Sequence, residues 1–65
     1  MTRIEVSAHT YDNSRELADL VRRHQIGLDV VDENDIRGTR ILTLEVVGRA
    51  DAVRGFMDEF DRRHW

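Results

Sequence analysis

The first residues of the chain alternate between apolar and polar side chains, which is the period of a half-buried β-strand. Asn13 is followed three residues later by Glu16, the spacing of a capping box that satisfies the first free amides of a helix. These patterns predict a strand over Arg3–His9 and a helix that begins near Ser14. The apolar face of that strand carries Ile4, Val6 and Ala8.

The predicted helix has apolar residues at the spacing i, i+3, i+4, i+7, which places them on one stripe facing a core. Gly27 can adopt the left-handed conformation of a helix C-terminal cap, so we expect the helix to end there. The stripe consists of Leu17, Leu20, Val21 and His24.

Two further strand patterns follow, joined by an acidic connection. The first covers Leu28–Glu33, and the second, Thr39–Val47, is the strongest strand pattern in the chain. The connection Asn34–Gly38 is longer than a two-residue hairpin loop, so we expect a wider turn with a positive φ at Gly38. The core-facing residues of this hairpin are expected to be Leu28, Val30, Leu42, Leu44 and Val46.

The last pattern is helical again and starts near Ala50. Gly55 falls on its outer side, where we interpret it as a tolerated glycine rather than as a close contact. Trp65 either folds back onto the core, the interpretation that we favour, or contacts a partner. The apolar stripe of this helix carries Val53, Phe56, Met57, Phe60 and His64.

The order β-α-β-β-α predicts an α+β two-layer sandwich in which two helices cover one face of a three-stranded sheet. A right-handed crossover places the first strand parallel to the hairpin and beside the third strand, as in a split β-α-β unit, so the sheet order is 1-3-2. The first strand then forms an edge with unpaired backbone groups, through which a homodimer can form.

The segment Val46–Val53 resembles the junction between a strand and the second helix in ACT-type regulatory domains, and the order of elements resembles a ferredoxin-like domain lacking its last strand. This resemblance implies an alternative function, an ACT-like regulatory module that acts as a dimer. Its small ligand would lie by the loop after the first strand, where this chain has the residues His9–Asn13.

Length and composition narrow the class of protein. Sixty-five residues allow one domain over residues 1–65, and the absence of cysteine excludes disulfides. Ten basic residues against thirteen acidic ones give a formal charge of −3, which argues against direct binding of nucleic acid through a basic patch. The chain carries no apolar run long enough for a membrane span and no signal-peptide pattern, so we expect a cytoplasmic protein.

Candidate chemistry is sparse. A calcium loop starting at Asp32 would need glycine and glutamate where the chain has Arg37 and Thr43, so the EF-hand pattern fails. His24 and His64 can meet in space, but half-buried structural histidines are commoner than metal ligands. We therefore expect no metal, no cofactor and no enzymatic activity.

The most distinctive feature is a group of acidic residues in and around the hairpin. With the carboxylates expected on the open face of the sheet, they form a candidate surface for an Arg- or Lys-rich protein partner, because charge complementarity steers association. A solvated turn is the competing interpretation. In size and in lack of catalytic motifs the chain resembles small phage-type inhibitors of host defence, including anti-CRISPR proteins that block nucleic-acid-binding sites. The candidate partner-binding residues are Asp29, Asp32, Glu33, Asp35, Glu45 and Glu5.

Overall fold

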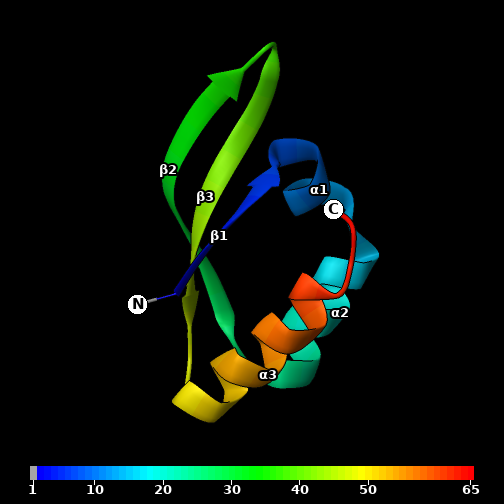
Figure 1. Cartoon of the computed structure of the whole chain (residues 1–65), viewed down its shortest axis with the longest axis vertical. Coiled ribbons are helices and arrows are strands. Elements are labelled where there is room, and N and C mark those ends of the chain that lie inside the picture. The colour runs from blue at the N-terminus through cyan, green and yellow to red at the C-terminus, as the bar shows by residue number, and fades with distance from the viewer. Residues whose placement is uncertain (1) are drawn as a thin grey trace.

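The computed structural model describes residues 2–65 and places a sheet on one side of a helical layer (Figure 1). Helices α2 and α3 form most of that layer, and α1 lies near the end of the first strand (Figure 1). The elements in chain order are β1 (Thr2–Ser7), α1 (Ala8–Asn13), α2 (Arg15–His24), β2 (Gly27–Ile36), β3 (Thr39–Val47) and α3 (Ala50–Asp61).

The three strands lie in the order β1-β3-β2, which confirms the predicted α+β fold and sheet order. Both neighbouring pairs are antiparallel. We expected the first strand to run parallel to the hairpin; this is confirmed for β2 and wrong for β3. β1 has the direction of β2, and β3 lies between them in the opposite direction, because the hairpin reverses the chain.

The core lies between the sheet and the helices, and the predicted alternation of buried positions is confirmed in β1 and β3. Leu44, Leu20 and Phe56 are the largest fully buried side chains, one from the sheet and one from each of α2 and α3. Burying a side chain of this size contributes about 1.5–3 kcal/mol. The complete buried cluster is Ile4, Val6, Leu17, Leu20, Ile26, Leu42, Leu44, Val46, Phe56 and Phe60.

The first strand ends two residues earlier than predicted, and the short helix α1 follows it directly. The Ser7 side chain caps α1 by accepting from the Thr10 amide at 3.1 Å. Ser14, not Asn13, caps α2, accepting from the Leu17 amide at 3.1 Å. None of the six residues of α1 is buried, so no apolar stripe marks this helix in the sequence.

Helix α2 ends at a left-handed residue, but that residue is Gln25 (φ 55°) and not Gly27. The Ile26 amide donates to the Val21 carbonyl at 3.2 Å, which closes a Schellman-type C-cap. This geometry turns Ile26 into the core, where it is 8% exposed. Gly27 instead begins β2.

The hairpin is longer and tighter than predicted. β2 continues to Ile36, and only Arg37 and Gly38 connect it to β3. Both have positive φ (52° and 83°), as a type I′ turn requires. The prediction of a wider turn is therefore wrong, and the predicted positive φ of Gly38 is confirmed. A β-bulge between Val30 and Asp32 shifts the register of β2 against β3.

The outer half of the hairpin extends beyond the helical layer (Figure 1), and residues 31–40 are all exposed. Val30 lies opposite the fully buried Leu44. It is nevertheless 48% exposed, so its expected place in the core is wrong. Leu28, nearer the helices, is only half-buried but packs against the core.

Helix α3 ends at Asp61, so Arg62, Arg63 and His64 lie beyond its last turn rather than within it. Trp65 folds back as predicted. Its ring stacks on Phe60 with 5.0 Å between the ring centroids, and its indole nitrogen donates to the Phe60 carbonyl at 2.9 Å.

Candidate protein-binding surface

The face of the sheet opposite the helices carries most of the predicted acidic residues. Because directly opposed residues of antiparallel strands share a face, the register assigns each side chain to one side of the sheet. Arg3, Glu45 and Asp29 lie side by side across the three strands. Glu5 and Asp32 flank Thr43 in the next such row. We call the four carboxylates Glu5, Asp29, Asp32 and Glu45 the acidic face.

Within residues 2–65, these two rows combine four carboxylates with one guanidinium, which leaves three net negative charges. The Arg3 guanidinium lies 4.0 Å from the Glu45 carboxylate. Asp29 faces Glu45 directly across the strand pair, an opposition of like charges that weakens a sheet. The face is therefore strongly acidic and only partly neutralised by its own residues.

Exposed apolar side chains lie at both ends of the acidic face. Val47, at the helix α3 end of β3, is 44% exposed. Toward the hairpin turn, the half-buried Ile41 lies on the same face as Thr43, and Ile36, opposite Thr39, is 54% exposed. An acidic centre with apolar ends is a composition suited to contact with another protein.

Glu33 and Asp35 do not join this surface. They oppose Leu42 and Arg40, which places them on the helix side of the hairpin. Glu33 forms a hydrogen-bonded ion pair with Arg40, and this bond raises the pKa of the Arg40 guanidinium above its ordinary value, with Asp35 and Asp12 acting in the same direction. The six-residue site predicted from the sequence is thus divided between two faces, because the bulge changes which residues of β2 point outward.

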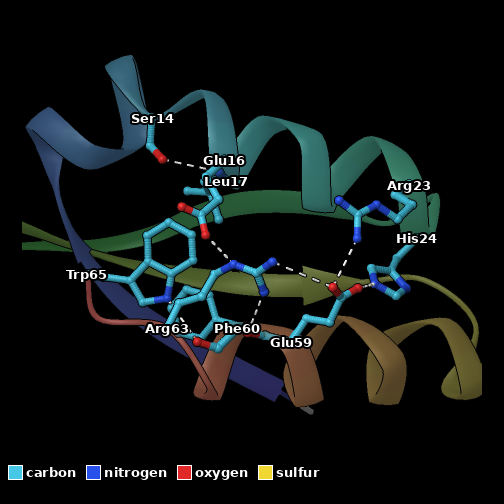
Figure 2. A network of polar contacts seen from close by, with 9 residues as sticks. All are labelled: Ser14, Glu16, Leu17, Arg23, His24, Glu59, Phe60, Arg63 and Trp65. Carbon is cyan, nitrogen blue, oxygen red and sulfur yellow. Dashed lines mark hydrogen bonds and ion pairs between the residues drawn. The ribbon is translucent and has the colours of Figure 1, made fainter.

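A second polar cluster, which sequence reasoning did not find, joins α2 to α3 (Figure 2). His24 donates from Nε2 to Glu59, and Arg23 donates to the same carboxylate at 2.9 Å. Arg63 bonds Glu16 and lies 3.7 Å from Glu59. We call these five residues the helix seam. Its contacts between α2 and Glu59 join residues more than thirty positions apart, so local spacing carries no signal for them, whereas Glu59 and Arg63 have the i, i+4 spacing of a helix.

The electrostatics of the helix seam favour an ionised Glu59. The hydrogen bond from His24 lowers the pKa of Glu59 below its ordinary value, and Arg23 and Arg63 act in the same direction against the effect of burial. On the other side of the imidazole lies Gly55, where an added Cβ would come 3.1 Å from His24 Nδ1. The seam therefore holds the two helices in close contact.

The histidines do not assemble into a metal centre. Among residues 2–65, no group of three His, Asp or Glu side chains is arranged to hold a metal ion. His24 is bound to Glu59, whereas His64 lies beyond α3 and lines, with His9 and Trp65, a depression of about 270 Å³. The ligand position implied by the ACT resemblance falls beside this depression, at α1, and ligand binding there stays a prediction.

Comparisons of the chain with protein-family models, with curated proteins and with solved structures find no significant match. None of the helices within residues 2–65 is long and apolar enough to cross a membrane. Function is therefore inferred from the surfaces of the molecule itself.

Proposed function

We propose that this chain is a non-enzymatic binding protein that covers a basic surface of a protein partner with its acidic face. The observation that supports the proposal is the register of the sheet. It brings Glu5, Asp29, Asp32 and Glu45 from three strands onto one face with a single arginine among them.

The arrangement has a cost to the isolated molecule that a cationic partner would relieve. Asp29 and Glu45 oppose each other directly, and Arg3 lies 4.0 Å from Glu45. Arginine or lysine side chains of a partner would lie between these carboxylates and replace repulsion with attraction. Such complementarity acts mainly on the association rate and on the choice of partner.

The class of partner follows from the same chemistry. A row of carboxylates on a sheet can occupy a groove whose basic residues otherwise bind phosphates. In size and in lack of catalytic motifs the chain resembles phage-type inhibitors of host defence, including anti-CRISPR proteins that block nucleic-acid-binding sites. The proposal places the present chain in that functional class, with Val47 and Ile41 supplying apolar contacts at the ends of the acidic face.

The test compares two variants that lose the same charge from different faces. Asp29→Asn/Asp32→Asn neutralises two carboxylates of the acidic face. Asp32 accepts a hydrogen bond from the backbone N–H of Glu33 at 2.8 Å, and asparagine keeps a side-chain oxygen that can accept the same bond. Glu33→Gln/Asp35→Asn neutralises two carboxylates on the helix side. With an arginine-rich synthetic peptide as the probe, calorimetry should give an affinity about tenfold weaker for the first variant and about twofold weaker or less for the second.

Equal losses in the two variants would show that only net charge matters and would contradict the proposal. Peptide-induced NMR shifts should cluster on the outer residues of β1, β3 and β2. A melting temperature that instead rises with free amino acids would favour the ACT-like alternative, because a ligand that binds only the native state stabilises it.

A further inference from the structure

Within residues 2–65, the sheet has two edges, β1 and β2, and they differ in their capacity to pair with another strand. The β2 edge carries a bulge at Val31 and a run of acidic residues, two features that oppose edge-to-edge pairing. β1 pairs with β3 over Thr2–Ser7 in continuous register and contains no bulge. β1 is therefore the edge suited to accept a strand.

The sequence of β1 is complementary to itself in one antiparallel register. When two copies pair about a two-fold axis with their helices on the same side of the joined sheet, each β1 residue that faces the core must lie opposite a core-facing residue of the other copy. Centring the pair on Arg3 or on Glu5 would place identical charges opposite each other, which destabilises a strand pair. Centring it on Ile4 places Arg3 of each copy opposite Glu5 of the other.

The same register suits the apolar side of the strand. The two-fold axis places the two Ile4 residues opposite each other, and each Ile4 faces its own core, where it is 5% exposed. A pocket of about 380 Å³ lies at the start of β1, where Thr2 lines it together with Val53 and Met57 of α3.

We infer that a second copy of this chain pairs with β1 in antiparallel register centred on Ile4, so that two three-stranded sheets join into one. Arg3, which already lies 4.0 Å from Glu45, then lies between that carboxylate and Glu5 of the second copy. The acidic faces of both copies point to the same side of the joined sheet. The inference does not depend on the proposed function, because it requires no other partner.

Sedimentation velocity over a range of protein concentrations tests the inference. The natural chain should show a concentration-dependent dimer. Arg3→Glu and Glu5→Arg each place like charges at both symmetry-related positions and should weaken dimerisation about tenfold or more. The double variant Arg3→Glu/Glu5→Arg should dimerise again, because it exchanges the two charges without changing their complementarity.

A mixture of the two single variants separates loss of pairing from loss of folding. One chain then carries two acidic residues at these positions and the other two basic ones, so the mixture should form a heterodimer although neither variant dimerises alone. Asp35→Arg, on the helix side of the other edge strand, serves as a control and should leave the dimer intact.

A natural chain that stays monomeric throughout the concentration range would overturn the inference. So would a dimer whose affinity is the same in Arg3→Glu and Glu5→Arg as in the natural chain. Failure of the mixed variants to associate, with both shown to be folded by circular dichroism, would exclude the register centred on Ile4.

Discussion

At the scale of single residues, the contact between Gly55 and His24 shows how a glycine positions two helices. An added Cβ would lie 3.1 Å from Nδ1 and 3.2 Å from Cε1 of the imidazole. The ring is held by its bond to Glu59 and by an edge contact with Phe56, whose centroid is 6.4 Å away. The interpretation of Gly55 as a tolerated glycine on the outer side of the helix is therefore wrong.

Gly55→Ala tests this contact against helix propensity. Alanine favours a helix by about 1 kcal/mol relative to glycine. We expect the variant nevertheless to lower the free energy of unfolding by about 1 kcal/mol, because the held imidazole cannot move away from a new Cβ. Urea denaturation followed through the fluorescence of Trp65, the only tryptophan, measures the change.

The matched control repeats the substitution in a His24→Ala background. There the space opposite residue 55 is open, so the same change to alanine should raise the free energy of unfolding by about 1 kcal/mol. An identical effect of Gly55→Ala in both backgrounds would mean that the imidazole does not restrict this position.

At the scale of elements, the hairpin depends on a turn whose first residue is unfavourable. Arg37 has a φ of 52°, a left-handed conformation that asparagine adopts far more readily than arginine. Gly38 fills the second position of the turn at no steric cost. The natural Asp-Ile-Arg-Gly segment thus forms a tight turn with only one of the two residues that usually favour it.

We expect Arg37→Asn to raise the free energy of unfolding by about 0.5 kcal/mol, because Asn-Gly is the preferred pair for a type I′ turn. Thermal and urea denaturation provide the measurement. Arg37→Ala removes the same side chain without relieving the left-handed strain, so it should give no such gain. A gain of equal size in the alanine variant would attribute the effect to the lost arginine instead.

At the scale of the whole molecule, the packing of α2 against α3 combines an apolar layer with the helix seam. Phe56 and Phe60 stack with 5.7 Å between their centroids, and Trp65 continues the stack. Beside this layer, Glu59 accepts from His24 and Arg23 (Figure 2). The apolar contacts are independent of pH, whereas the Glu59 contacts require an ionised carboxylate.

The lowered pKa of Glu59 predicts the sign of the pH dependence. A carboxyl group whose pKa is lower in the folded state stabilises that state above its unfolded pKa, near the ordinary value of 4.5, and this contribution is lost as the pH falls toward the folded pKa. We expect Glu59→Gln to be less stable than the natural chain at pH 7. It should also lose less stability than the natural chain as the pH falls from about 5 to about 3, the range that begins near the ordinary carboxyl pKa and extends toward the lowered one.

Denaturation curves measured across this range provide the test. Asp58→Asn removes the same charge from an exposed position of α3 outside the helix seam. The free energy of unfolding of this control should fall with decreasing pH as it does in the natural chain. An equally weakened pH dependence in both variants would contradict the role assigned to Glu59.

The candidate surface shows where sequence reasoning reached its limit. The alternation in Thr39–Val47 places Glu45 outward correctly, because strand periodicity is a property of consecutive residues. Glu33 and Asp35 were grouped with Asp29 and Asp32 only because all four lie close together in the sequence of the hairpin. That grouping was wrong because neighbouring strand residues face opposite sides, and because a bulge shifts the phase of every residue beyond it by an amount that the sequence pattern does not show.

By itself, the sequence determined the order of the main elements, the buried sides of β1 and β3 and the 1-3-2 sheet, since these follow from local periodicity and from chain connectivity. Only the tertiary structure decided that Gln25 takes the left-handed cap, that His24 meets Glu59, and that the acidic residues divide between two faces. Each of these features depends on the energy of a contact between residues distant in the chain or on the register of neighbouring strands, and neither quantity is contained in a local pattern.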